Sequence, residues 1–132
     1  MATAPVLEFL GENLDLAVTR GVTVQFTHML VIDDGSENPY DLTGHIIRAT
    51  VRKDATAPVF ANFDVDDSRF DEGIYTITLP AAVTATFAVG RSLTSSASRY
   101  RWDSEMETPE GIVVPLQYGY LRVSPEVTSG AL

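Results

Sequence analysis

The sequence predicts an all-β fold, an immunoglobulin-like antiparallel β-sandwich of about seven strands with one short helix. Three observations lead to this prediction. Apolar and polar residues alternate through most of the chain, which is the period of half-buried strands. The alternating stretches recur roughly every ten residues with turn signals between them, a spacing typical of sandwiches and barrels. A length of 132 residues fits one domain, which we place at 14–128, between an arm, 1–13, and a tail, 129–132.

Four strands are expected in the first half of the chain, at residues 14–18, 22–32, 45–53 and 59–65. One face of the second strand carries Val22, Val24, Phe26, His28, Leu30 and Ile32. One face of the fourth carries Val59, Ala61, Phe63 and Val65. In the third strand Ile47, Ala49 and Val51 share a face, and the intervening positions are mostly polar. Residues 33–41 are rich in Asp, Asn, Gly and Pro, which predicts a loop.

Three further strands are expected at 74–79, 99–107 and 112–128. The Ala-rich segment Pro80–Phe87 predicts one or two helical turns that link two sheets, because proline is tolerated in the first turn of a helix. Trp102 lies on the apolar face of its strand and is expected in the core. Residues 108–111 suit a type I hairpin turn. Pro115 cannot donate to a ladder and predicts an edge or a bulge.

Composition and charge limit the partners of the chain. Nine basic and eighteen acidic residues give a net charge of -9, which disfavours nucleic acid and anionic membranes. The longest unbroken apolar run, Met29–Ile32, is far shorter than the roughly 20 residues of a membrane span. No Lys or Arg precedes Arg20, so no secretory signal is expected. The absence of cysteine excludes disulfides and thiolate chemistry.

Histidines and acidic loops are the first candidates for a reactive or metal site. His28 and His45 each lie alone, whereas metal and triad chemistry needs several convergent groups. One acidic connection holds Asp64, Asp66, Asp67, Asp71 and Glu72. It fails the helix-loop-helix calcium pattern because Arg69 stands where a turn glycine is required. A second acidic loop holds Asp33, Asp34, Glu37 and Asp41, which are better explained as turn formers.

Three acidic residues, Asp103, Glu105 and Glu107, share one face of a predicted strand. Paired carboxylates can hydrolyse glycosides, but same-face acids at every second position are also typical of a solvated strand face. The nine glycines form no phosphate-binding loop. We therefore expect no enzyme, no cofactor and no metal, while a bound cation or glycan stays an open alternative.

Two groups of residues are candidates for a protein interface. Arg48, Arg52 and Lys53 are assigned to one strand face, and Arg99 and Arg101 to another. Eight of the nine basic residues are arginine, which is enriched at interfaces, so these side chains favour a positive patch that meets an acidic partner. The second group is the apolar part of the N-terminal arm, which either covers the core or inserts into a neighbouring subunit. It comprises Val6, Leu7, Phe9 and Leu10.

Three sequence runs resemble a family of small structural proteins of tailed bacteriophages. They are DLTGHIIRATVRK, GIYTITLPAAVTATFAVGR and YRWDSEMETPEGIVVPLQYGYLRVSPEVT. The shared features are a DLTG strand start, a strand before an Ala/Thr-rich helical turn, a Y.WD strand and a closing VSPEVT. The resemblance covers about residues 14–128. It is strongest at Asp41–Gly44, Tyr100–Asp103 and Gly119–Thr128.

The resemblance implies a non-enzymatic virion component, made in the host cytoplasm, similar to immunoglobulin-like N-terminal domains of baseplate or tail-fibre anchoring proteins. Larger relatives continue into a fibre or receptor-binding module, whereas this sequence ends four residues after Thr128. We therefore expect a tail, baseplate or neck adaptor, present in several copies and contacting other virion proteins. Two alternatives stay open: a capsid decoration protein, and a carbohydrate-binding module. The second would use Tyr40, Tyr75, Tyr118 and Tyr120.

Overall fold

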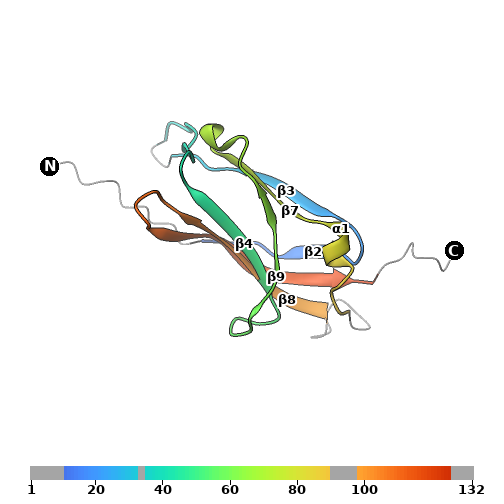
Figure 1. Ribbon diagram of the computed structural model, residues 1–132. Coiled ribbons are helices and arrows are strands. Elements are labelled where there is room, and N and C mark those ends of the chain that lie inside the picture. The colour runs from blue at the N-terminus through green and yellow to red at the C-terminus, as the bar shows by residue number, and fades with distance from the viewer. Residues whose placement is uncertain (1–10, 33–34, 90–97, 126–132) are drawn as a thin grey trace.

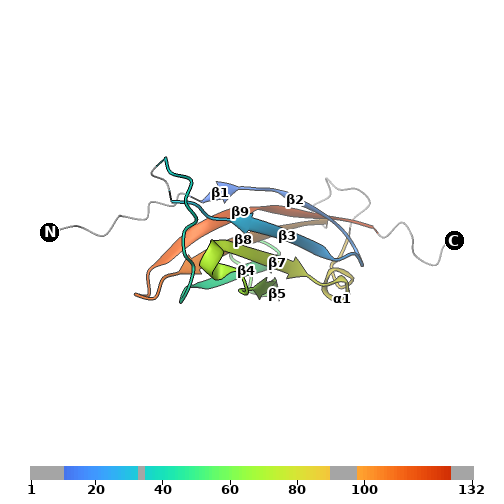
Figure 2. The same cartoon turned by 90° about the horizontal axis from the view of Figure 1, so that it is seen from above.

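The computed structural model describes residues 11–32, 35–89 and 98–125, which form two β-sheets packed face to face (Figure 1). Sheet A has the order β1-β9-β8-β4-β5, with β2 also paired to β9, and sheet B has the order β3-β7-β6. Figure 2 shows the β3 and β7 layer against the layer of β9, β8 and β4. The predicted all-β fold class, a β-sandwich of two packed sheets, is confirmed.

The described residues form nine strands and two short helices. The strands are β1 Glu12–Asn13, β2 Leu16–Thr19, β3 Val24–Met29, β4 Ile46–Arg52, β5 Val59–Asn62, β6 Asp64–Asp66, β7 Ile74–Leu79, β8 Arg99–Glu107 and β9 Val113–Ser124. The helices are the 3-10 turn η1 Phe70–Glu72 and the α-helix α1 Ala81–Thr84. Seven strands were expected. The two additional strands arise because the expected strand 59–65 is divided into β5 and β6, and because β1 precedes the expected strand 14–18.

The expected strand 59–65 is divided at Phe63, where the chain passes from sheet A to sheet B. Phe63 is buried, and its amide still donates to the Ala49 carbonyl of sheet A at 2.9 Å. The alternation of apolar residues continues through this crossover, which is why the sequence pattern does not reveal it. Val59 was expected on the apolar face but is 42% exposed, because a register irregularity in the β4–β5 pairing turns this end of the strand outward.

The second expected strand, 22–32, is too long at both ends. β3 ends at Met29, and the Leu30 amide donates to the carbonyl of Gly73, the residue before β7, at 2.8 Å. Leu30 is buried as expected, but Val22 and Ile32 are exposed. The apolar series of this segment therefore contributes to the core only between Val24 and Leu30.

The N-terminal strand corrects two expectations. β1 and β2 pair in parallel with β9, so the sandwich is not antiparallel throughout. Sheet A also begins at Glu12, two residues before the expected domain boundary. Between β1 and β2 the Leu14 carbonyl turns into the interior and accepts a hydrogen bond from Trp102 Nε1 at 2.8 Å. Asp15 Oδ1 takes the place of a ladder carbonyl and accepts the Tyr120 amide proton at 2.9 Å.

Gly119 is required for this arrangement because it lies directly under Leu14. A Cβ atom on Gly119 would lie 2.2 Å from the Leu14 carbonyl oxygen, closer than real Cβ contacts allow. The backbone of residue 119 has an ordinary conformation, so space and not backbone strain requires glycine here. The N-terminal strand is therefore held to sheet A by two hydrogen bonds, one from the Trp102 indole of β8 and one to the Asp15 carboxylate, and the absence of a side chain at Gly119 leaves the space for it.

Aromatic rings fill the core as the sequence predicts. Trp102 is 2% exposed, and its ring meets those of Phe26 and Phe63 at centroid distances of 5.9 and 5.7 Å. At the α1 end, Phe87 stacks on Tyr100 at 4.9 Å. Such pairs contribute about 0.5–1.5 kcal/mol each beyond their buried area.

A polar network also crosses the core between the two sheets. The Tyr75 hydroxyl lies 2.9 Å from His28 Nδ1 and 3.3 Å from Gln117 Oε1, and Ser104 Oγ donates to the same Gln117 oxygen at 3.1 Å. Tyr75, Ser104 and Gln117 are buried, so each needs such partners. Burial raises the pKa of the Tyr75 phenol above its ordinary value. The network fixes the alignment of β3 and β7 over β8 and β9.

The turns and helices follow the sequence with small shifts. Gly111 donates to the Thr108 carbonyl at 2.8 Å, which closes the expected β8–β9 turn. Pro115 lies at a bulge, because Ser104 pairs with Gln117 whereas Glu105 pairs with Pro115. The helix expected over residues 80–87 is shorter, with Pro80 as N-cap of α1, and it connects the two sheets as predicted. The sequence did not indicate η1, which buries Phe70.

Candidate functional site

The outer face of sheet A collects the charged residues that the sequence singled out. The buried residues of β4 and β8, such as Val51 and Trp102, face the core, so their neighbours in each strand face outward. The strand register places Arg52 beside Arg101 and Arg48 beside Glu105. This outer face comprises Arg48, Thr50 and Arg52 of β4, Arg99, Arg101, Asp103, Glu105 and Glu107 of β8, and Tyr118, Tyr120 and Arg122 of β9.

Three arginines surround the ring of Tyr120. The guanidinium carbons of Arg99, Arg101 and Arg122 lie 5.1, 5.1 and 5.4 Å from the ring centroid. Cross-strand register explains this arrangement, since Arg101 is opposite Tyr120 and Arg99 is opposite Arg122. We call these four residues the Tyr120 arginine cluster. It concentrates three positive charges on one exposed face of a chain whose net charge is -9.

The other predicted interface arginines have partners of their own. Arg48 donates from Nε to Glu105 at 3.0 Å and from Nη2 to Glu107 at 2.9 Å. Hydrogen bonds to Glu107 and Glu105 raise the pKa of the Arg48 guanidinium above its usual value. Arg52 donates to the Ala57 carbonyl at 2.9 Å. The structure therefore brings Arg99 and Arg101 together in one cluster and leaves Arg48 and Arg52 outside it.

Lys53 does not share the face of Arg48 and Arg52, which corrects the sequence interpretation. It follows the end of β4, its ammonium lies 4.4 Å from the centroid of the inward-facing Tyr100 ring, and it donates to the Arg99 carbonyl at 2.9 Å. Burial, with a smaller contribution from Arg99, lowers the pKa of Lys53. This lysine closes the end of the sandwich instead of extending the outer face.

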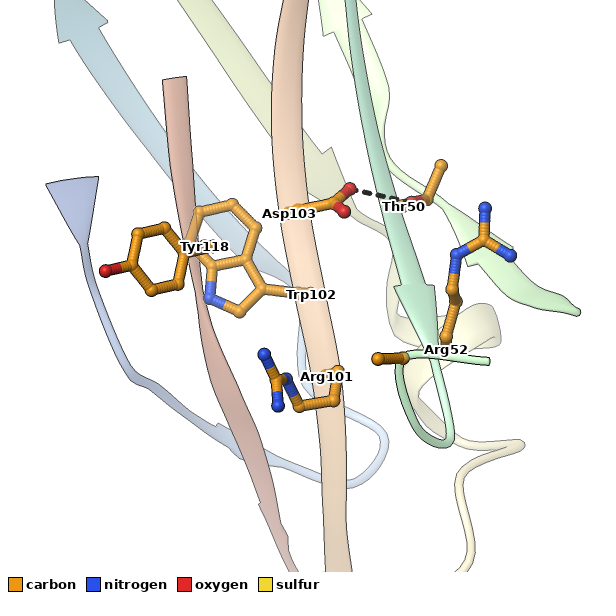
Figure 3. A pocket seen from close by; sticks show the side chains of 7 residues that line it. Thr50, Arg52, Arg101, Trp102, Asp103 and Tyr118 are labelled. Atoms are coloured by element: carbon orange, nitrogen blue, oxygen red, sulfur yellow. Dashed lines mark hydrogen bonds between the residues drawn. The ribbon is translucent and has the colours of Figure 1, made fainter. Parts of the chain in front are cut away.

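Two shallow hollows lie on either side of Tyr118. The first, of about 100 Å³, lies between β4, β8 and β9 and is lined by Thr50, Arg52, Ala55, Arg101, Trp102, Asp103 and Tyr118. Figure 3 shows Arg101 reaching from β8 toward β9, while the Arg52 guanidinium lies on the opposite side, beyond β4. The second, of about 140 Å³, is lined by Asn13, Asp15, Arg101, Tyr118, Gly119 and Tyr120. Sites for drug-sized ligands usually have about 300–1,000 Å³.

The acidic residues of the outer face each have a cross-strand contact. Glu105 and Glu107 hold Arg48, and Asp103 accepts a hydrogen bond from Thr50 Oγ1 at 3.1 Å. Their predicted placement on one face is correct. This arrangement orders the β4–β8 pair, and it uses the same carboxylates that a hydrolase would need for acid-base chemistry.

The acidic connection after β6 is organised as turns. Asp66 Oδ1 accepts the Ser68 amide proton at 2.9 Å, and hydrogen bonds from the backbone and side chain of Ser68 lower the pKa of Asp66. Glu72 is paired with Arg69 at 2.9 Å. Within the described ranges, no three His, Cys, Asp or Glu side chains are arranged to hold a metal ion.

The histidines and two of the four candidate tyrosines take part in internal contacts. His28 belongs to the core network, and His45 Nε2 lies 3.1 Å from the Tyr40 hydroxyl. Tyr75 is fully buried, so it lies on no outer surface, contrary to expectation. Tyr118, 42% exposed, and Tyr120 remain on the outer face.

Several predicted residues lie outside the described ranges. They are Val6, Leu7, Phe9 and Leu10 of the arm, Asp33 and Asp34 of the acidic loop, and the tail 129–132. In the part of the chain that the structure describes, no helix is both long and apolar enough to cross a bilayer.

The strand pattern contains a signal for Arg122, which was not among the predicted interface residues. Tyr118, Tyr120 and Arg122 alternate along the last strand and must share a face. Their meeting with Arg99 and Arg101 depends on the β8–β9 register, which a bulge near Pro115 shifts by one residue. Alternation along the last strand could therefore indicate which residues lie on the outer face of sheet A, but not that Arg99, Arg101 and Arg122 meet around Tyr120.

Comparisons with known proteins show no family for this chain. No protein-family model matches the sequence, and no curated protein matches it either. Among solved structures, the chain is similar to a mutant of the SrpA adhesin from Streptococcus sanguinis, with 8% identity and a TM-score of 0.49. The alignment covers 83% of this chain and 54% of that one, so the chain spans about half the length of the structure it matches. This likeness carries no statement about function.

Proposed function

We propose that the chain is a non-enzymatic structural component of a tailed bacteriophage particle, an adaptor of the tail, baseplate or neck. It joins its neighbours through the outer face of sheet A. The observation that carries this proposal is the Tyr120 arginine cluster, an outward-facing concentration of arginine and tyrosine on a broad sheet face. Arginine and aromatic residues are enriched at protein interfaces and in their energetic hot spots.

The motif residues behind the phage resemblance support the fold more than the interface. Asp41 Oδ1 accepts hydrogen bonds from the Thr43 amide at 2.9 Å and from its hydroxyl at 2.6 Å, which forms a tight turn before β4. Tyr100 and Trp102 are buried, and Gly119 makes room for Leu14. A shared scaffold of this kind lets relatives keep one sandwich while their exposed faces serve different neighbours.

The shape of the outer face also favours a macromolecular partner. The two hollows flanking Tyr118 are small, whereas the face extends over three adjacent strands of sheet A. Apolar side chains continue it toward the β8–β9 hairpin, where Ile46 and Val113 flank Glu107 and are each 50% exposed. A face with an apolar end and a cationic end is suited to one extended contact with another protein.

Carbohydrate binding is the second candidate, and exposed Tyr118 is the observation that favours it. The ring stands between two hollows lined by Asn13, Asp15, Arg101 and Asp103, which supply donors and acceptors for sugar hydroxyls. Glycan-array binding that Tyr118→Ala or Tyr120→Ala abolishes would favour this candidate over the adaptor.

The adaptor proposal is tested in particles assembled in cells that carry the encoding genome. We expect the chain in purified particles at a few copies or a few rings, by quantitative mass spectrometry. Hundreds of copies would favour capsid decoration instead. Absence of the chain from mature particles would contradict both structural roles.

A further inference from the structure

We propose that two copies of this chain pair edge to edge through β3. A two-fold axis at Thr27 relates the copies, and their B sheets join into one continuous antiparallel sheet. The contact uses a surface other than the outer face of sheet A, so it does not depend on the adaptor role.

β3 is the least protected edge among the described strands. It forms the border of sheet B (Figure 1), and its six residues, Val24–Met29, include no Asp, Glu, Lys, Arg or Pro. The other edges carry features that usually prevent edge pairing. β5 has four residues and a register irregularity, β6 has three residues with Asp64 and Asp66, and the end of β9 that β1 does not reach contains Pro115. β3 is therefore the described edge that is best suited to pair with another strand.

The backbone of β3 directs three residues toward this open border. The Leu30 amide donates to the Gly73 carbonyl on the β7 side. Successive residues of an antiparallel strand direct their N–H and C=O groups to opposite sides, so Gln25, Thr27 and Met29 direct theirs away from β7. Within the described residues, no hydrogen bond reaches these outward backbone groups.

The core-facing side of β3 is covered less than that of its neighbour. Its three core-facing residues, Val24, Phe26 and His28, are half-buried, whereas the β7 residues opposite them are fully buried. Both strands lie over the same core, and the difference arises because β3 has a neighbour on one side only. A strand added beyond β3 would cover the open flank of these three side chains.

An axis at Thr27 pairs every outward group. It places Thr27 opposite Thr27 of the second copy and Gln25 opposite Met29 of the second copy, so that all three residues exchange N–H···O=C bonds. On the core side it places Phe26 beside His28 of the second copy. An axis at Phe26 would instead leave Met29 beyond the end of the opposing strand.

A row of threonines favours a second copy as the occupant of this edge. Thr27 Oγ1 lies 2.7 Å from Thr76 Oγ1 on the outer face of sheet B, and Gln25 donates to Thr78 at 3.0 Å in the next cross-strand row. Threonine pairs across neighbouring strands stabilise a sheet. In the dimer the Thr76–Thr27 row continues across the axis into the same two residues of the second copy.

Sedimentation equilibrium of the whole chain measures the dissociation constant of the dimer. We expect it to fall as salt rises, because each copy carries a net charge of -9 and salt screens the repulsion. Thr27→Lys and Thr27→Glu each place two like charges opposite one another and should raise the constant about fivefold or more. An equimolar mixture of the two variants should dimerise more tightly than either alone, because residue 27 then meets the opposite charge.

Two further variants separate the backbone from the side chain. Thr27→Pro removes the outward N–H but no bond to β7, so the monomer keeps its ladder. We expect dimerisation to weaken about tenfold, because each copy loses a hydrogen-bond donor. Thr27→Val keeps the N–H and should stay within about threefold. Unchanged Trp102 emission checks that each variant is folded.

An oxidative cross-link tests the register, because the chain has no cysteine of its own. Hydrogen-bonded antiparallel residues have Cα atoms about 5.5 Å apart, within the range of about 4.4–6.8 Å that disulfides require. Thr27→Cys should therefore form a covalent dimer. Thr76→Cys is the matched control on the same face: three strand spacings, about 14 Å, separate it from its counterpart, so it should stay monomeric.

Three results would overturn this inference. One is a whole chain that stays monomeric up to about 1 mM. Another is equal weakening of the dimer by Thr27→Pro and Thr27→Val, or a Lys/Glu mixture that dimerises no better than its components. The third is a monomeric chain that dimerises only when Phe9→Asp and Leu10→Asp are introduced, which would assign the β3 edge to the N-terminal arm.

Discussion

Gly119→Ala should release the N-terminal strand from sheet A. The added methyl group would lie 2.2 Å from the Leu14 carbonyl oxygen and 2.8 Å from Asp15 Oδ1, so the backbone of Leu14 has to move by about 1 Å to reach ordinary contact. A shift of this size away from β8 stretches the Trp102–Leu14 hydrogen bond, now 2.8 Å, beyond bonding distance.

The cost follows from the bonds that are lost. An unpaired buried indole N–H costs about 1–3 kcal/mol, and loss of the Asp15–Tyr120 bond costs about 1 kcal/mol more. We expect a total of about 3 kcal/mol, a large part of the 5–15 kcal/mol typical of a domain. At the size of this chain such a loss lowers the melting temperature by roughly 10 °C.

Urea unfolding followed by tryptophan fluorescence measures this loss directly, because Trp102 is the one tryptophan in the sequence. Gly111→Ala is the matched control: its φ of 87° strains an alanine, but no atom lies within 4 Å of the added Cβ. We expect a loss of about 1 kcal/mol there. Equal losses in the two variants would refute the steric explanation at Gly119.

Three other predictions concern the turns and the surface. Thr84→Val should cost about 2 kcal/mol in urea unfolding, because the buried hydroxyl bonds to the backbone of the turn between β2 and β3 at 2.9 and 3.1 Å. Hydrogen bonds within their turns lower the pKa values of Asp41, Asp54 and Asp66. The stability that these carboxylates contribute is therefore complete above their pKa in the unfolded chain, near 4, and is lost as pH falls through their lower pKa values in the folded chain. Melting temperatures should therefore be flat from about pH 7 to 5 and decline below about pH 4. The decline should be shallower in the triple Asp→Asn variant, because asparagine keeps the hydrogen-bond acceptor but does not titrate. An unaltered slope in that variant would contradict this explanation. Arg48→Gln should cost less than about 1 kcal/mol, because its ion pairs are 32–43% exposed, and a larger loss in the same assay would show that the outer face stabilises the fold more than we infer.

The sequence predicted the features that depend on a period of two. Trp102 is buried because alternate residues of its strand share one dry face, and the pattern of Tyr100, Trp102, Ser104 and Met106 states this directly. The bulge at Pro115 was also predictable, because proline has no amide proton to donate to a ladder. These inferences need only local geometry.

Features that depend on contacts between distant strands were beyond the pattern. The parallel pairing of β1 and β2 with β9 joins residues about a hundred positions apart. Alternation of apolar residues does not indicate whether a strand pairs in parallel or antiparallel with its neighbour. Phe63 lies at the crossover from sheet A to sheet B and is buried, so the alternation of apolar residues continues through it. The division of the fourth strand therefore left no trace in the sequence.

The candidate site was predicted in part. Arg99 and Arg101 were correctly placed on an outward face, but the sequence grouped them with Arg48 and Arg52 and not with Arg122. Which arginines cluster is decided by the β8–β9 register and by the glutamates that hold Arg48. Single-strand periodicity contains neither piece of information.

A density map of assembled particles tests the central claim most directly, that the outer face of sheet A is a docking surface. We predict that Arg101, Tyr118 and Tyr120 are covered by a neighbouring protein. A map in which this face points to solvent while another surface makes the contacts would contradict the claim.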